Sequence, residues 1–480
     1  MNEIANYKKI IAAVGAFLFI SPNLNIPESI LTYCGISSHD TVRLLAVIIF
    51  AVIDVILVLA FFKAKPSPKM YLILVVFNAI YILPQVINKD LTAMMQYCLF
   101  VVPTTVFAIM LSADDEIKEK FFVYLRAVTK ILMVIALVYI ILQYVGTNRD
   151  KYGMIIIENM TYGDMAYLFL PGFVVCLIDI VESKSIFSYL GIVIFSLAIL
   201  FAGARSTVLC IACAIVIYWI ILIVSKAEKK RFIRVLIVTV LTVATLFTGM
   251  LILPTGSRLD VLNINIKSEQ FSENIIFETK ATSSRTLTVI YVPTGEEKKL
   301  YDLYRDEIIN NDRSKKETER ILREDVKNNT EEYIKLINED DRAKAESYFL
   351  TMNRDFLWKA AIAEFKKHPL TGNGFRYYKN KYDGYFPHNI FLEAMADFGA
   401  IGLIIITALG AFCFIKGMLY YFKNKNVNIL RMLLLLFSQF PGYVLYTTMY
   451  NNASLALTIV FFTTLGVLDY NERKDPKLDK

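Results

Sequence analysis

The amino-acid sequence predicts an all-α polytopic membrane protein with about twelve transmembrane helices. Two observations carry this prediction. Of the 480 residues, 56% are hydrophobic and the mean hydropathy is +0.49, which is too apolar for a soluble protein to keep its surface in water. The apolar residues also come in uninterrupted runs of about twenty, the length that crosses the hydrocarbon core of a bilayer.

The predicted spans form two groups separated by a long polar segment. They lie near 7–22, 42–62, 70–88, 91–111, 122–145, 164–182, 186–203, 205–225, 232–253, 398–421, 428–447 and 451–469. The first run follows a short basic segment, but no small-residue cleavage site comes after it, so we expect a retained helix. The expected regions are nine helices over 1–253, a large loop over 254–397, and three helices with a tail over 398–480.

Short loops rich in lysine and arginine predict the orientation. The loops after the second, eighth and tenth spans are basic, as are both ends of the chain. All of these lie in the cytoplasm if both termini do. This arrangement also explains the net charge of +7 without a nucleic-acid partner. It places residues 254–397 outside the cytoplasmic membrane.

The large extracytoplasmic loop is too long for an unstructured connection, so we expect it to fold. Its β-branched stretches at Val261–Ile266 and Thr286–Val292 predict short strands. From Glu296 to Leu350, charged and apolar residues alternate at helical spacing, which predicts surface helices. The loop is therefore expected to mix helices and short strands.

Metal-binding and cofactor motifs are missing from the sequence. The three histidines, His39, His368 and His388, are not clustered. Cys210 and Cys213 fall inside a predicted span, where small packing residues are common. We therefore expect no metal site and no cofactor.

The most informative stretch begins at Arg354. Residues Arg354 to Lys367 predict an amphipathic helix that ends before Pro369. Gly372 and Gly374 then predict a tight turn, because glycine tolerates positive φ.

The segment Pro387-His388-Asn389 is expected to open the next helix, so that His388 lies at the mouth of the membrane region. The field of a helix N-terminus attracts anions such as phosphate. It also disfavours the protonated imidazole, which leaves His388 as a usable base. A helix-capping or interfacial histidine is the alternative interpretation.

These motifs resemble the C-terminal signature of the O-antigen ligase and Wzy polymerase superfamily of bacterial surface polysaccharide synthesis. The matching positions are Arg354-x-x-x-Trp358, Pro369-x-x-Gly372-x-Gly374, and His388-Asn389-x-x-Leu392 with Gly399 and Gly402. Asp397 takes the place of the family's usual glutamate. A second segment, Phe201 to Ser206, resembles the family's S-G-S-R-S motif, with alanines at its serine positions.

The resemblance implies a GT-C-like, metal-independent membrane glycosyltransferase that works at the outer face of the membrane. Its donor is a glycan on undecaprenyl diphosphate, and its leaving group is the lipid diphosphate. A metal-free diphosphate needs fixed cations, which arginine supplies. We therefore expect Arg205 and Arg354 to contact it. The alternatives are a snorkelling arginine for Arg205 and a surface ion pair with Asp355 or Glu364 for Arg354.

Further residues, beside the glycine turn and at Arg285 in the large loop, are expected to serve this reaction. His388 accepts the proton of the attacking sugar hydroxyl or orients that hydroxyl. The residues expected to bind substrate are Asn389, Arg285, Arg376, Tyr377, Glu393 and Asp397. Arg376 and Tyr377 are equally consistent with packing. Glu393 and Asp397 can orient His388, bind sugar hydroxyls or cap a neighbouring element.

Three functions remain in competition. The favoured one is a polymerase that joins lipid-linked repeats into a capsule or O-antigen-like chain in the bacterial cytoplasmic (inner) membrane. Its expected partners are the lipid-linked donor, a glycan acceptor, membrane lipid, a flippase and a chain-length regulator. The close alternative is a ligase that transfers the glycan to lipid A core or another acceptor. A lipid-linked oligosaccharide flippase is a third, although we find no related halves such as transporters usually show.

Overall fold

The computed structural model describes most of the chain outside the long polar segment. The described residues are 2–21, 25–36, 38–64, 66–87, 94–95, 97–145, 155, 157, 160, 162–183, 185–225, 228–252, 275–282, 285–292, 354–381, 386–445 and 453–474. They fall into two compact units, the first comprising Met1–Arg258 with Thr407–Lys480 and the second Leu259–Ile406.

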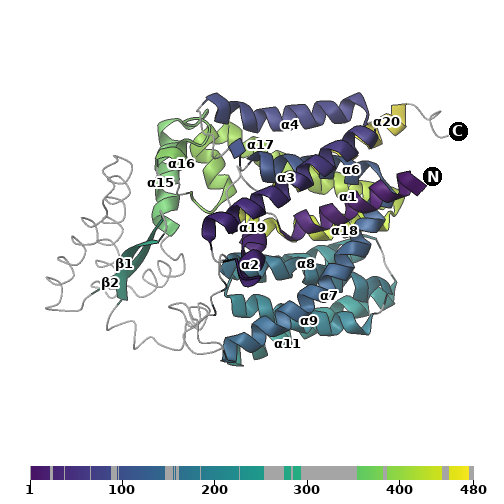
Figure 1. Cartoon of the computed structure of the whole chain (residues 1–480), viewed down its shortest axis with the longest axis horizontal. Helices are drawn as coiled ribbons and strands as arrows, with labels where there is room; N and C mark the ends of the chain where they lie inside the picture. Colours follow the sequence, from purple (N-terminus) through teal and green to yellow (C-terminus); the bar gives the residue numbers. More distant parts are fainter. Residues whose placement is uncertain are drawn as a thin grey trace. The chain divides into compact units, whose positions relative to one another are not determined.

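The first unit is a bundle of helices that run mostly alongside one another (Figure 1). In chain order they are α1 (Asn2–Ile20), α2 (Asn25–Tyr33), α3 (His39–Ala64), α4 (Pro68–Ile87), η1 (Tyr97–Val101), α6 (Val102–Ala113), α7 (Asp115–Val145), α8 (Tyr162–Ser183), α9 (Ile186–Ala202), α10 (Arg205–Val224), α11 (Lys229–Ile252), α18 (Val427–Phe437), α19 (Phe440–Leu445) and α20 (Ala453–Lys474). Helix α8 is the most enclosed of the six longest apolar helices, because α7, α9, α10, α11 and α18 all pack against it. Its side chains at Phe169, Phe173 and Leu177 are fully buried.

Six helices of the described chain are long and apolar enough to cross a membrane, and the number rises to seven if the bent pair α1 and α2 counts as one span. The two members of that pair meet at 91°. Shorter apolar helices follow the remaining hydrophobic runs. Every predicted span thus coincides with a helix or a pair of helices, whereas the count of twelve spans stays a prediction.

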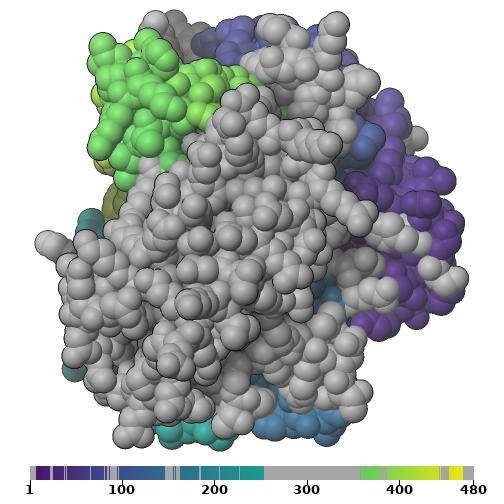
Figure 2. Space-filling view, turned by 90° about the vertical axis from the view of Figure 1, so that its left-hand side faces the viewer, coloured from purple at the N-terminus to yellow at the C-terminus, as the bar shows by residue number. Residues whose placement is uncertain are grey.

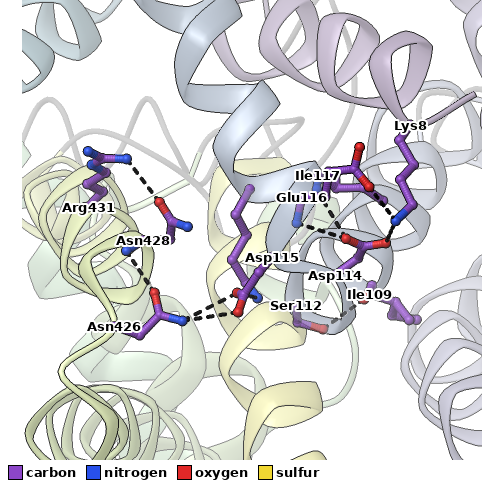
Figure 3. A network of polar contacts seen from close by, with 11 residues as sticks. Lys8, Ile109, Ser112, Asp114, Asp115, Glu116, Ile117, Asn426, Asn428 and Arg431 are labelled. Carbon is purple, nitrogen blue, oxygen red and sulfur yellow. Dashed lines mark hydrogen bonds and ion pairs between the residues drawn. The ribbon is translucent and has the colours of Figure 1, made fainter. Parts of the chain in front are cut away.

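A polar network joins the ends of three helices of this unit (Figure 3). Lys8 of α1 lies 2.7 Å from the carboxylate of Asp114, just before α7. Asn426 donates to the neighbouring Asp115 carboxylate at 3.2 Å. Its own side-chain oxygen caps α18 by accepting the N–H of Asn428 at 2.9 Å. The contacts fasten α1, α7 and α18 to one another at one end of the bundle.

Two carboxylates of α8 are neutralised by arginines from neighbouring helices. Arg126 of α7 lies 2.6 Å from Asp179, and Arg431 of α18 lies 2.7 Å from Glu182. All four side chains are largely enclosed, so removal of one partner leaves a poorly solvated charge.

The second unit contains a two-stranded antiparallel hairpin and three helices. Strand β1 (Ile275–Thr282) pairs with β2 (Arg285–Val292) in a register that places Thr279 opposite Thr288. The strand expected at Thr286–Val292 is therefore confirmed. The strand expected at Val261–Ile266 and the helices expected over 296–350 lie outside the described residues.

The helices of the second unit are α15 (Arg354–Lys367), α16 (Tyr377–Lys381) and the first part of α17 (Ile390–Asn424), which continues into the first unit. Their outer surface is seen in green in Figure 2. Helix α15 ends where the sequence predicted, before His368 and Pro369. A small core of alanines and Tyr378 holds the three helices together, and its buried members are Ala360, Ala361, Tyr378 and Ala396.

Candidate functional site

Two backbone turns of the second unit interlock. The turn after α15 contains Gly372, at φ 68°, and α17 is broken at Gly399, at φ 65°. The N–H of Gly374 donates to the carbonyl of Asp397 at 2.8 Å, and the N–H of Ala400 donates to the carbonyl of Pro369 at 2.8 Å. The glycine turn predicted from the sequence is confirmed. Its backbone hydrogen bonds hold the kink of α17 against the end of α15.

Three of the motif glycines leave no room for a side chain. A methyl group at Gly372 would overlap the backbone of Asp397, and one at Gly399 would lie 2.5 Å from the carbonyl of Leu370. At Gly402 a side chain would overlap that of Phe398. Gly374 is different, because its surroundings are open and only its φ of 111° favours glycine. The motif therefore fixes the angle between the two turns.

Asp397 is fully buried and caps helix α16. Its Oδ1 accepts the backbone N–H of Tyr378 at 2.8 Å, and the Tyr378 hydroxyl donates to the carbonyl of Leu357 at 2.8 Å. Of the roles expected for Asp397, the structure shows the capping of a neighbouring element. A contact with sugar at this position stays a prediction.

Glu364 is a second buried carboxylate of this unit. Its Oε1 accepts hydrogen bonds from Lys367 at 2.8 Å and from Lys381 at 2.6 Å, which ties α15 to α16. Burial alone would raise the pKa of this carboxyl, but the two lysines outweigh burial and lower the pKa. The sequence analysis considered Glu364 only as a possible ion-pair partner of Arg354. The side chain of Arg354 lies outside the described residues.

His388 lies just before α17 and not inside it. Helix α17 begins at Ile390, and the side-chain oxygen of Asn389 caps it by accepting the N–H groups of Phe391 at 3.0 Å and Leu392 at 3.2 Å. The expectation that Pro387-His388-Asn389 opens the next helix is confirmed, with His388 one residue before the Asn389 cap. The backbone of His388 is left-handed, with φ 51°, a conformation that only a few per cent of non-glycine residues adopt.

Two aromatic residues fix the surroundings of His388. The ring of Phe386 lies 4.2 Å from the imidazole, measured between centroids. Trp358 of α15 donates its indole N–H to the carbonyl of Pro387 at 2.8 Å. Left-handed residues held in place by neighbouring contacts are often functional. The sequence placed Trp358 in the motif but gave no sign of this long-range bond.

The other predicted substrate residues of this unit are buried or half-buried. Arg376 is 6% exposed and has φ 54°, and Glu393 is 1% exposed. Tyr377 lies under the Lys381 ammonium, 5.6 Å from its ring centroid. Burial raises the pKa of the Tyr377 phenol, and the Glu364 carboxylate adds to the rise. The side chain of Arg285, the first residue of β2, lies outside the described residues.

In the first unit, the motif around Arg205 forms the start of a helix. Gly203 ends α9 in a left-handed conformation, with φ 75°, and Ala204 precedes α10 without a side-chain cap. Arg205 is the first residue of α10, although its side chain lies outside the described residues. Its neighbour Ser206 accepts a hydrogen bond from the Tyr167 hydroxyl at 3.1 Å. The first amides of α10 are therefore open to an anion.

Metal ligands are not grouped in the described chain. No cluster of three or more histidine, cysteine, aspartate or glutamate side chains occurs among the described residues.

The O-antigen ligase family model matches residues 190–407. The matched region contains both motifs, from the start of α10 to the kink of α17. Over this region the chain is similar to the O-antigen ligase family. No curated protein and no solved structure matches the chain. The apolar helices and this similarity together point to a bacterial membrane protein and support a ligase- or polymerase-type function.

Proposed function

We propose that the protein is a polymerase of lipid-linked oligosaccharide repeats at the outer face of the cytoplasmic membrane. The donor is a growing glycan on undecaprenyl diphosphate, and the acceptor is the next lipid-linked repeat. The observation that carries the proposal is the O-antigen ligase family match over 190–407, which spans the Arg205 and His388 motifs.

In the proposed reaction, the acceptor hydroxyl oxygen bonds to the anomeric carbon of the donor. The bond between that carbon and the diphosphate oxygen breaks, and its electron pair leaves with the lipid diphosphate. The hydroxyl proton passes to His388. Direct displacement of this kind inverts the anomeric centre.

The local geometry supports His388 as the base. The residue precedes a helix N-terminus, whose field opposes a positive charge on the imidazole. The indole N–H of Trp358 is bonded to the carbonyl of Pro387, and the Phe386 ring lies tilted against the imidazole at 4.2 Å, so the backbone before His388 and one side of its ring are both in contact with neighbouring groups. A base that is held in one orientation needs less reorganisation in the transition state.

Charge stabilisation of the leaving group is assigned to Arg205 and Arg354. Arginine binds phosphate oxygens through two parallel N–H groups and stays charged at any working pH. Arg205 also begins α10, whose free amides favour the same anion. Arg285 is a further cation for this role. The proposal requires no metal and no nucleotide sugar.

A ligase that transfers the finished glycan to lipid A core or another acceptor has the same requirements for donor and base. The two functions differ in the acceptor. We favour the polymerase, with both termini in the cytoplasm, the large loop outside, and a flippase and a chain-length regulator as partners.

The test is deletion of the gene and its reintroduction as the wild type or as His388→Ala. A polymerase defect leaves single repeats on undecaprenyl diphosphate at the outer face and no long polymer. A ligase defect instead leaves full-length polymer on the lipid. Repeats that stay on the cytoplasmic side would support a flippase and overturn the proposal.

A further inference from the structure

A tyrosine of α8 meets the start of α10 inside the first unit. The Tyr167 hydroxyl donates to the Ser206 hydroxyl oxygen at 3.1 Å. Tyr167 lies in the second turn of α8, and Ser206 is the second residue of α10 and only 8% exposed. The contact joins a helix that is otherwise part of the core to the residue that follows Arg205.

The position of the Tyr167 hydroxyl is fixed from a third helix. A side chain at Gly442 of α19 would overlap this hydroxyl, so glycine is needed for α19 to approach it. The Cys210 thiol, one turn after Ser206, also interacts with the Tyr167 hydroxyl and with the Gly442 backbone. Three helices therefore hold one phenol oxygen beside Ser206.

The direction of this hydrogen bond has a chemical consequence. A phenol is more acidic than an aliphatic hydroxyl and is the better donor, so Tyr167 donates and Ser206 accepts. The proton of Ser206 then remains to be donated elsewhere. Within the described part of the chain, no acceptor for it is found.

Other hydrogen-bond donors lie in the same first turn of α10. The backbone N–H groups of Arg205 and Ser206 are in the first turn of α10, where an α-helix provides no carbonyl partner. Thr207 is fully buried, and its hydroxyl oxygen has no hydrogen-bond partner among the described residues. A set of donors without acceptors at a helix start fits an anion.

We propose that Tyr167 is a positioning residue for the diphosphate of the donor lipid. Tyr167 holds Ser206 so that the serine hydroxyl donates to a phosphate oxygen, next to Arg205 and the first amides of α10. This inference rests on the proposed function, in which that diphosphate is the leaving group. It adds a residue of α8 and a glycine of α19 to a site that the sequence motif confined to residues 201–206.

The experiment is a double-mutant cycle in proteoliposomes with an undecaprenyl-diphosphate-linked repeat as substrate. Tyr167→Phe is expected to raise KM by about 3- to 10-fold and to change kcat little, because one hydrogen bond to Ser206 is lost. Ser206→Ala raises KM by at least as much. The double variant should match Ser206→Ala alone, because Tyr167 acts through Ser206.

Inorganic diphosphate provides a readout that does not depend on turnover. Its inhibition constant should rise in Tyr167→Phe and in Gly442→Ala, which displaces the phenol. The control is Tyr97→Phe, which removes the hydroxyl of a buried tyrosine bonded to Asn78, far along the sequence from α10. It should leave both KM and the inhibition constant unchanged.

The outcomes separate the inference from the proposed function. If the wild type does not turn over the lipid-linked repeat at all, the proposed function fails. If the wild type is active and Tyr167→Phe leaves KM and diphosphate inhibition unchanged, the positioning role is overturned. Additive effects of the two substitutions would also overturn it.

Discussion

Trp358 and Pro387 are joined by a hydrogen bond of 2.8 Å from the indole N–H to the backbone carbonyl, 29 residues apart in the chain. The bond links helix α15 to the residue before His388. His388 itself is in a left-handed conformation that its neighbours must maintain. The orientation of the histidine therefore depends on a side chain of another helix.

Trp358→Phe keeps an aromatic ring but removes the donor. We expect it to lower the rate of glycan transfer by about 3- to 10-fold, which corresponds to one lost hydrogen bond. The matched control is Trp219→Phe, since the indole of Trp219 donates to the Thr239 hydroxyl between α10 and α11. Polymer yield per molecule of membrane-inserted protein measures the difference. Equal losses for the two variants would contradict the positioning of His388 by Trp358.

Gly372→Ala tests the interlocked turns. The added methyl group overlaps the Asp397 backbone and forces an unfavourable φ of 68°, so we expect a loss of at least about 2 kcal/mol of stability in this region. The unfolding temperature in detergent measures the loss. Gly410→Ala is the control, because its position within α17 is open and helical. An unfolding temperature unchanged by Gly372→Ala would mean that the turns do not depend on close contact.

Much of the site around α15, the glycine turn and His388 could be predicted from the sequence. The helix over 354–367, the glycine turn and the start of a helix near His388 follow from proline, glycine and apolar spacing, which are local signals. The sequence did not show that Gly372 and Gly399 face each other, because contact between distant turns has no local pattern. Tyr167 was overlooked for the same reason, since a tyrosine in an apolar helix is ordinarily a packing residue.

Low pH should weaken the contact between α15 and α16 that Glu364 makes. The hydrogen bonds from Lys367 and Lys381 hold the pKa of Glu364 below its ordinary value of 4.5. A carboxyl with a lowered pKa in the folded state stabilises the fold above its ordinary pKa, and this stabilisation is lost as the pH falls through the lowered value. We expect the unfolding temperature to drop below pH 4.5 in the wild type. Glu364→Gln should be less stable at pH 7 and should lose part of this acid sensitivity. The same pH profile in both proteins would contradict the assignment.

Two aspartates inside membrane helices should respond oppositely to replacement by leucine. One carboxylate oxygen of Asp54 in α3 is buried and has no hydrogen-bond partner among the described residues, whereas Asp179 is paired with Arg126. Asp54→Leu should raise the unfolding temperature, because it removes an unsatisfied polar group. Asp179→Leu should lower it, because it leaves an arginine without its partner. A lower unfolding temperature for Asp54→Leu would show that Asp54 has a stabilising partner.

The central claim is that His388 is the base of a glycosyl transfer from a lipid diphosphate. The most direct measurement uses purified protein in proteoliposomes with an undecaprenyl-diphosphate-linked repeat, and follows chain elongation together with release of undecaprenyl diphosphate. The account predicts that His388→Ala loses at least about 100-fold in rate, while His368→Ala, at an exposed histidine 20 residues earlier, keeps full activity. Wild-type rates of elongation and lipid release in His388→Ala would contradict it.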